Sequence, residues 1–369
     1  MKVPFVDLQA QYQAHKTEID TAIQNILDTS QYMMGPGVLN FEKDFGEYLG
    51  VANVVTVSDG THALELALRA LAVGAGDEVI VPAHTFVATA ESVSIIGATP
   101  VFADVDPSTH QMTLETVLPR VTAKTKVITP VHLYGSAVDI DPILAFAQEK
   151  NIFVIEDAAQ AHGTRYKEKR VGGNGVLSCF SFYPGKNLGT YGEGGAVATN
   201  DPVLAEKVRL IRDHGSRVKY QHEVLGGNFR MSGIEGAVVG AKLPHLEEWN
   251  ARRRAHAAQY RELLAGVAEI TFPLVPDFVE PNYHLCIVTT EKRDALQAYL
   301  KERDIHTGIH YPIPCHLQPV YASLGYHEGD MPHAEKIARE TLSLPMYAEL
   351  SSEQITYVCD AIKAFFGTV

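Results

Sequence analysis

The stretch NVVTVSDGTHALELALRALAVGAGDEVIVP, residues 53–82, carries the pattern on which the fold depends. Its first five residues are mostly β-branched and predict a buried strand, and residues 78–82 predict a second strand. The intervening helix, residues 61–72, has one apolar face, made of Ala63, Leu64, Ala67, Leu68 and Leu71. Strand, helix and strand in succession are typical of a parallel sheet.

The same alternation continues to about residue 200. Further strands are expected at residues 101–103, 126–131 and 152–155, and further helices at residues 85–96 and 139–150. This order predicts an α/β fold, with a mainly parallel sheet flanked by helices on both faces. Ligands of such sheets bind at the carboxyl ends of the strands.

The character of the sequence changes after residue 201. Helices are expected at residues 203–214 and 247–264, and strands and helices mix from about residue 270. A chain of 369 residues is also too long for one ordinary core. We therefore predict a large domain over residues 1–243 and a smaller C-terminal α+β domain over residues 244–369.

Composition limits the classes of partner. The net charge of −13 argues against nucleic acid as a partner. No run of 18 apolar residues would span a membrane, and residues 1–7 lack the apolar core of a signal peptide. We expect a cytoplasmic protein without a membrane partner. The four cysteines have no metal-ligand spacing and are expected to be reduced and packed.

Two features at strand ends could hold a ligand. The motif SDGT, residues 58–61, joins a strand to a helix, and Gly60 would let backbone N–H groups approach an anion. An ordinary helix cap by Ser58 or Asp59 explains this motif equally simply. Asp157 closes a buried strand, where a carboxylate could pair with a protonated pyridine nitrogen or could cap the next turn.

A lysine follows in the motif SFYPGKNLG, residues 181–189. Lys186 lies among Pro, Gly and apolar residues, and partial burial would lower its pKa and favour a Schiff base. An ordinary loop lysine is the alternative. The Ser181 hydroxyl could donate to a phosphate or to the local backbone. The glycines in YGEGGAV, residues 191–197, indicate tight backbone packing, expected beside the lysine, and lack dinucleotide-binding spacing.

Together these motifs resemble the DegT/DnrJ/EryC1/StrS family of sugar aminotransferases, which are fold-type I pyridoxal 5'-phosphate enzymes. The resemblance runs almost end to end, from VPFVDL at residues 3–8 through EDAAQAHG at residues 156–163 to LPM at residues 344–346. It includes GNFRM at residues 227–231 and HYPIP at residues 310–314. His62 and Glu193 stand where many relatives have Asp, which leaves the reaction class intact.

The resemblance implies a role for each residue of a cofactor site. Lys186 would form the internal aldimine and move protons, and Asp157 would pair with the pyridine nitrogen. The other implied contacts are Gln160 hydrogen-bonded to the phenolic oxygen or packed beside the ring, Phe86 over the ring, Gly60, Thr61 and Ser181 at the phosphate, and Asn228 from a second subunit. A homodimer with a shared active site is therefore expected.

The implied reaction moves an amino group from L-glutamate to a nucleotide-linked keto sugar. Relatives that dehydrate typically replace the lysine with His, so Lys186 favours transamination. The motifs resemble the subgroup that aminates C3 of dTDP-linked 3-keto-6-deoxyhexoses, as in deoxyamino sugar biosynthesis for O-antigens or other glycans. A 4-keto sugar, a UDP-linked 3-keto sugar, a cyclitol ketone and a non-catalytic regulatory relative are the alternatives.

Sugar contacts are the least specific predictions. The candidates for the substrate side are His162, Tyr183, Lys219, His310, Tyr311 and His316. Each could instead be a packed or surface residue. No metal site is predicted, because no carboxylate or cysteine stands at ligand spacing beside His306, His310 and His316.

Overall fold

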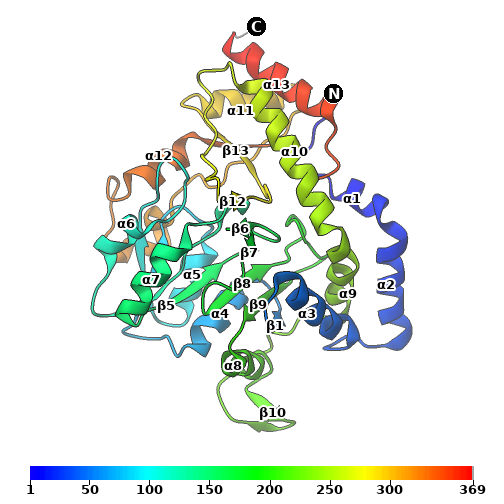
Figure 1. Cartoon of the computed structure of the whole chain (residues 1–369), viewed down its shortest axis with the longest axis vertical. Helices are drawn as coiled ribbons and strands as arrows, with labels where there is room; N and C mark the ends of the chain where they lie inside the picture. The colour runs from blue at the N-terminus through cyan, green and yellow to red at the C-terminus, as the bar shows by residue number, and fades with distance from the viewer. Residues whose placement is uncertain (368–369) are drawn as a thin grey trace.

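A seven-stranded sheet forms the centre of the computed structural model, which describes residues 1–367 (Figure 1). In spatial order its strands are β1 (Asn53–Val57), β9 (Gly195–Thr199), β8 (Leu177–Ser181), β5 (Phe153–Asp157), β4 (Thr125–Ile128), β2 (Glu78–Pro82) and β3 (Thr99–Ala103). Strand β9 is antiparallel to both of its neighbours, and the other pairs are parallel. The predicted mainly parallel sheet is confirmed.

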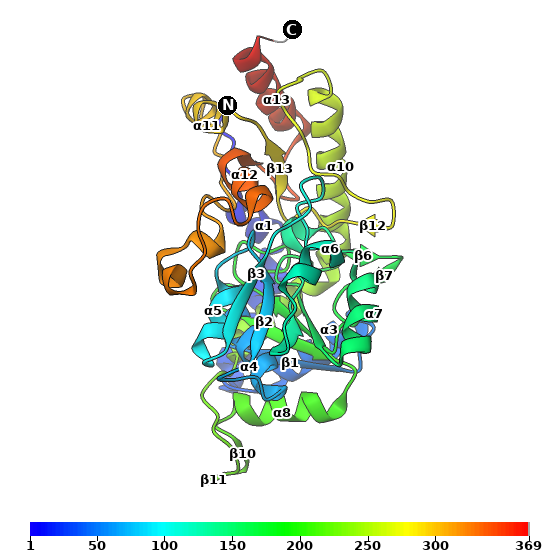
Figure 2. The same ribbon diagram turned by 90° about the vertical axis from the view of Figure 1, so that its left-hand side faces the viewer.

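Helices cover both faces of this sheet (Figures 1 and 2). Val55, Val79 and Ile155 point into one apolar core, which includes residues of α4 (Gly60–Ala70), α5 (Ala88–Ile95) and α8 (Pro202–Arg212). Strand residues one position away, such as Val54, Ile80 and Val154, point into the opposite core with α3 (Pro36–Leu49) and α7 (Ile140–Lys150). The two-residue period of a strand therefore fills two cores at once, which explains why these strands read as continuous apolar runs.

A third apolar core lies in the C-terminal part of the chain. It joins the second half of α10 (Leu246–Leu264) to β13 (Cys286–Thr289), β14 (Thr341–Leu344) and α13 (Ser352–Phe366). Val3 is buried in the same core, and its backbone N–H donates to the carbonyl of Asp304. The N-terminal segment is therefore anchored on the C-terminal part, and the domain boundary between residues 243 and 244 stays a prediction.

The remaining elements complete the described chain. They are α1 (Leu8–Ala14), α2 (Lys16–Thr29), α6 (Leu114–Val117), α9 (Gly233–Lys242), α11 (Arg293–Lys301), α12 (Pro332–Glu340), the hairpin β10 (Ser216–Val218) and β11 (Gln221–His222), and the small sheet of β6 (Arg165–Tyr166), β7 (Lys169–Arg170) and β12 (Val279–Glu280). Within residues 1–367, no helix combines the length and apolar character needed to cross a membrane.

Two predicted elements are shorter than expected. The helix predicted at residues 85–96 begins at Ala88, because Thr85, Phe86 and Val87 form the turn that leaves β2. The strand predicted at residues 126–131 ends at Ile128, ahead of Pro130, whose carbonyl accepts from the Asp157 N–H. Both corrections lie at the carboxyl end of the sheet, where ligands are expected to bind.

Candidate active site

Gly60, Asp157, Ser181 and Lys186 of the predicted cofactor site lie at one end of the sheet. Asp157 is the last residue of β5 and Ser181 is the last residue of β8. Gly60 opens α4 directly after β1, and the loop that carries Lys186 follows β8. Because β1, β5 and β8 run in the same direction, their carboxyl ends bring these residues to one edge.

The start of α4 is shaped to receive an anion. Asp59 caps the helix, because its side chain accepts a hydrogen bond from the His62 N–H at 2.9 Å. The first backbone N–H of the helix that bonds to the Asp59 carbonyl is that of Ala63. The N–H groups of Gly60 and Thr61 precede that first turn and are free to face a ligand. The capping and anion-binding interpretations of this motif are thus compatible.

Glycine is required at two positions for this packing. A Cβ atom on Gly60 would lie 2.6 Å from the Ser181 Cβ, so only glycine lets the helix start approach that serine. A Cβ atom on Gly195 would lie 2.2 Å from the Asp59 carbonyl oxygen. The glycine-rich run after the lysine therefore packs against the α4 start at Gly195, which sets the distance between Gly60 and Ser181.

Asp157 is a buried carboxylate whose nearest donors are neutral. Its Oδ2 accepts from the Thr89 hydroxyl at 2.8 Å and its Oδ1 from the Ala159 N–H at 3.1 Å. Burial raises its pKa, and the Thr89 hydrogen bond, the Ala159 N–H and the charge of Lys186 only partly oppose that rise. A protonated pyridine nitrogen would supply the missing cation.

Lys186 lies in the loop after β8 with its backbone N–H bonded to the Tyr183 carbonyl at 2.8 Å. The side chain is partly accessible, yet the surrounding protein desolvates the amine and lowers its pKa to about 8, against an opposing effect of Asp157. An amine with this pKa is far more often neutral at physiological pH than an exposed lysine, as attack on an aldehyde requires.

Gln160 is held between two aromatic residues. Its Oε1 accepts from the Tyr134 backbone N–H at 2.7 Å, and its Nε2 donates to the Tyr311 hydroxyl at 3.1 Å. The Phe86 ring lies 5.6 Å from the Tyr311 ring, and Phe86 is 52% exposed and accessible to a ligand. The Tyr183 side chain is 54% exposed beside Lys186.

The buried Tyr134 hydroxyl connects His310 to the residues around Gln160. The Tyr134 hydroxyl donates to the His310 carbonyl at 2.8 Å, so the 2.5 Å contact with His84 must use a hydrogen on His84 Nε2. Burial is the main cause that lowers the pKa of His84 to about 3, and burial and Lys186 lower that of His310 to about 4. Both imidazoles are neutral at physiological pH. Neither His84 nor Tyr134 belongs to a recognisable sequence motif, and sequence reasoning missed both.

Four predicted residues are either buried or on the exposed surface, although His162 is close enough to Lys186 for the lysine charge to lower the pKa of the histidine. His162 is fully buried between Phe180 and Phe182. His316 is also buried, and its Nε2 lies 3.2 Å from Glu335. Lys219 and Asn228 are exposed, and Lys219 lies in the β10–β11 hairpin that projects from the molecule (Figures 1 and 2).

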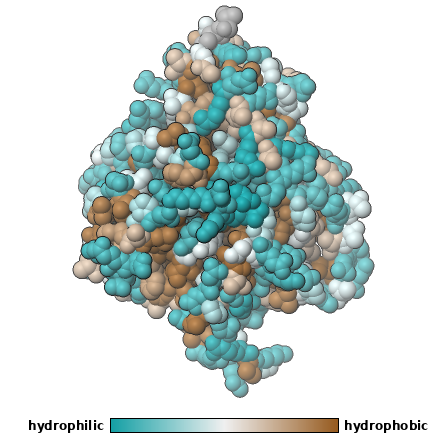
Figure 3. All heavy atoms as spheres, in the orientation of Figure 1, coloured by the Kyte–Doolittle hydropathy of each residue, from teal (hydrophilic) through white to brown (hydrophobic). Residues whose placement is uncertain are grey.

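The β10–β11 hairpin and the residues that follow it expose several large apolar side chains. Tyr220 is 81% exposed and Leu225 is 87% exposed, and Figure 3 shows hydrophobic atoms among the hydrophilic ones over this part of the surface. Exposed large apolar side chains on a projecting hairpin are typical of an interface. The position of Asn228 near this hairpin is consistent with its predicted role in a second subunit.

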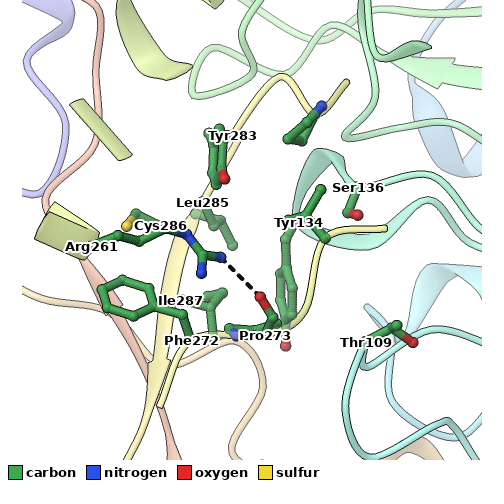
Figure 4. Close-up of a pocket in the computed structure, with 12 residues that line it drawn as sticks. Thr109, Tyr134, Ser136, Arg261, Phe272, Pro273, Tyr283, Leu285, Cys286 and Ile287 are labelled. Atoms are coloured by element: carbon green, nitrogen blue, oxygen red, sulfur yellow. Dashed lines mark hydrogen bonds between the residues drawn. The ribbon is translucent and has the colours of Figure 1, made fainter. Parts of the chain in front are cut away.

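A small cavity lies next to the predicted site without belonging to it. Figure 4 shows Tyr134 and Ser136 facing Arg261 and Cys286 across this cavity. The Arg261 Nη2 donates to the Pro273 carbonyl at 2.9 Å at its wall. Its volume is about 30 Å³, and its lining includes none of the predicted site residues.

The histidines considered for a metal are separately engaged. His310 Nδ1 lies 2.7 Å from the Ser343 hydroxyl, and His316 is paired with Glu335. Over residues 1–367, the three side chains whose metal-ligating atoms lie within 4.8 Å of one another are His15, Glu18 and His245. That group joins α2 to the start of α10 and does not include any predicted site residue.

Comparisons with known proteins extend over nearly the whole chain. The family model described as the DegT/DnrJ/EryC1/StrS aminotransferase family matches residues 13–363. A Streptomyces venezuelae protein named dTDP-3-amino-3,4,6-trideoxy-alpha-D-glucose transaminase is 45% identical over 98% of this chain and 96% of its own length. A Geobacillus stearothermophilus protein named pleiotropic regulatory protein is 46% identical over 99% of both chains.

A solved structure shows the same similarity in three dimensions. The crystal structure of S. venezuelae DesV in complex with a ketimine intermediate superposes with a TM-score of 0.98. It is 44% identical in sequence and covers 100% of this chain and 99% of its own. The similarity in fold and sequence thus includes every element that carries a predicted site residue.

Proposed function

Because the chain belongs to the DegT/DnrJ/EryC1/StrS family of pyridoxal 5'-phosphate-dependent sugar aminotransferases, we propose that it transfers an amino group from L-glutamate to a dTDP-linked 3-keto-6-deoxyhexose. The observation that carries this proposal is the presence in one site of a desolvated Lys186, a buried Asp157 and the free amides at the start of α4. The dTDP sugar and the C3 position are supported by the name of the S. venezuelae relative.

The residues fit the cofactor at each of its functional groups. Pyridoxal phosphate, when bound, supplies an electron sink for bond cleavage at the amine carbon. Asp157 would keep the ring nitrogen protonated, and Ser181 with the amides of Gly60 and Thr61 would hold the phosphate. Phe86 would cover the ring.

Lys186 would have two tasks. Its neutral amine would hold the cofactor through the aldehyde group, and once freed by the amino donor the same amine would accept and return a proton at the reacting carbon. A pKa of about 8 suits both tasks, because the amine is readily protonated and deprotonated near neutral pH. Gln160, fixed by Tyr134 and Tyr311, would hydrogen-bond the phenolic oxygen.

The substrate side of the site is proposed to be shared between two subunits. Tyr183, His310 and Tyr311 lie on the lysine's own chain and are proposed to contact the sugar. Asn228 and Lys219 are exposed near the projecting hairpin and are proposed to reach the neighbouring site of a homodimer. His162 and His316 are buried, so a substrate role for either would require a change in their surroundings. The cytoplasmic location and a role in O-antigen or other glycan synthesis stay predictions.

The test is the absorbance spectrum of the purified protein with pyridoxal phosphate. We expect a visible band that collapses on addition of L-glutamate and returns with a dTDP-3-keto sugar. Lys186→Ala should abolish the band and turnover, while Lys169→Ala, at an exposed lysine of β7, should leave both unchanged. Return of the band only with a 4-keto sugar, a UDP-linked sugar or a cyclitol ketone would overturn the substrate and keep the reaction class.

A regulatory protein is the second candidate, because a relative that is 46% identical bears a regulatory name. The combination of Lys186, Asp157 and Ser181 in one site argues against a function without turnover. A band that forms with pyridoxal phosphate and persists through glutamate and every keto sugar would make this second candidate the leading one.

A further inference from the structure

Directly after the lysine, Asn187 is 1% exposed, although an asparagine in a loop is normally solvated. Its Nδ2 donates to the Asn250 Oδ1 at 2.8 Å and to the Asn282 carbonyl at 3.0 Å. Its Oδ1 lies 3.2 Å from the His284 Nδ1. Every hydrogen of this amide is therefore used, and its oxygen has a partner.

The asparagine partners of Asn187 are also hydrogen-bonded through their amide groups. Asn250 Nδ2 donates to the His162 carbonyl at 2.8 Å, and Asn282 Nδ2 donates to the carbonyls of Gln160 and His162 at 3.0 Å each. Both side chains are 0% exposed. The network thus ties the lysine loop to the Gln160 loop, to α10 and to the segment that leads into β13.

Two glycines make room for the network. A Cβ atom on Gly135 would lie 1.7 Å from the Asn282 Oδ1, and one on Gly163 would lie 2.6 Å from the Asn250 Nδ2. Both glycines have positive φ angles, of 84° and 81°. The backbone at both glycines therefore comes close enough to the two amides to leave no room for a side chain.

The network also determines the tautomer of one histidine. Because both Asn187 amide hydrogens face carbonyl-type acceptors, its Oδ1 must face His284, whose Nδ1 then carries the hydrogen. The lone pair of His284 is left on Nε2. Burial, with Lys186 next among the causes, holds the pKa of His284 well below its usual value, so the imidazole is neutral.

We propose that Asn187 is a positioning residue, which orients Lys186 toward Asp157 and Gln160 by fastening the lysine loop to Asn250, Asn282 and His284. The amide acts on the neighbouring residue through the backbone and does not touch the reacting atoms. The position of the C-terminal part of the chain, which contributes Asn282 and His284, is thereby coupled to the lysine. This inference rests on the proposed role of Lys186.

The test measures the lysine itself in the full-length chain after removal of the cofactor. The probe is acetic anhydride, with labelling of Lys186 followed by peptide mass spectrometry between pH 6 and pH 11. Wild type should label with a midpoint near pH 8. Asn187→Ala should raise that midpoint by about one pH unit or more, because a loosened loop lets water reach the amine. With the cofactor bound, kcat should fall about tenfold or more with little change in KM for the keto sugar.

Two further variants separate positioning from general loosening. Asn250→Ala removes the same hydrogen bond from the α10 side and should shift the midpoint in the same direction, even if Asn187→Ala does not fold. Thr190→Val removes a different hydrogen bond of the same loop, to the Glu235 carbonyl at 3.2 Å, and should leave the midpoint at its wild-type value. Midpoints equal to wild type in both asparagine variants would overturn the proposal. Absence of a cofactor band in wild type would instead overturn the proposed function, so the two failures are distinguishable.

Discussion

Replacement of Glu156 by Gln gives a sharp test of the polar interactions beneath the site. Glu156 precedes Asp157 on β5 but points into the opposite side of the sheet and is 0% exposed. Its oxygens accept from the N–H groups of Asn174 and Gly175 at 2.9 and 2.8 Å and from the Ser178 hydroxyl at 2.7 Å. His132 Nε2 lies 3.0 Å away. Because His132 Nδ1 accepts from a backbone N–H, its Nε2 carries the hydrogen and donates to Glu156.

The expected loss of folding free energy follows from the pKa of the Glu156 carboxyl. Burial alone would raise its pKa, but the hydrogen bonds from His132, the Gly175 N–H and the Ser178 hydroxyl together lower it from 4.5 to about 2. A difference of about 2.5 pH units, at about 1.4 kcal/mol per unit, corresponds to about 3 kcal/mol of folding free energy. Because the folded pKa is depressed, this contribution is fully present above about pH 4.5 and is lost as the pH falls toward 2.

The assay is urea unfolding of the full-length chain at several pH values. Glu156→Gln should lower the free energy of unfolding by about 3 kcal/mol at pH 7, and the difference from wild type should shrink steadily below pH 4.5. Glu149→Gln, at an exposed position of α7, should leave the stability at pH 7 unchanged. A loss at pH 7 that persists unchanged to pH 3 would refute the reasoning, since it would arise from packing and not from the charged carboxylate.

Four further outcomes concern the cofactor site. Asp157→Asn should keep the fold yet lower kcat by about a hundredfold or more, measured with the natural donor, because the ring nitrogen loses its anionic partner. Ser181→Ala should weaken pyridoxal phosphate binding by about tenfold or more in a fluorescence titration, through loss of a hydrogen bond to a charged group. Gly60→Ala should weaken that binding further than Ser181→Ala, because the added Cβ would lie 2.6 Å from the Ser181 Cβ and would displace the α4 start. The rate of cofactor capture by cofactor-free protein should rise with pH and level off above about pH 8, where Lys186 is neutral; a rise that continues to pH 10 would mean an ordinary exposed amine.

Local sequence patterns were sufficient to predict the sheet and the order of the candidate site residues along the chain. Residues 54–57 are all β-branched and residues 79–81 are β-branched and apolar, without a polar residue at every second position, as in a strand buried on both faces. Gly60, Asp157 and Lys186 lie at the end of a strand or in the loop that follows one, so the common direction of those strands was enough to predict that they lie at the same edge of the sheet. Boundaries were less accurate where a turn residue such as Pro130 ends a strand early.

The supporting contacts could not be predicted in this way. Thr89 meets Asp157 across 68 positions of sequence, and Asn187 meets Asn282 across 95. A single asparagine or threonine has the same local signal whether it is solvated in a loop or buried in a network. The alternation of strands and helices along the chain therefore determined the architecture and the reactive groups, because hydrophobic periodicity is a local property. The tertiary structure alone decided the burial, tautomers and pKa values of those groups, because they depend on donors and charges that only folding brings within about 3 Å.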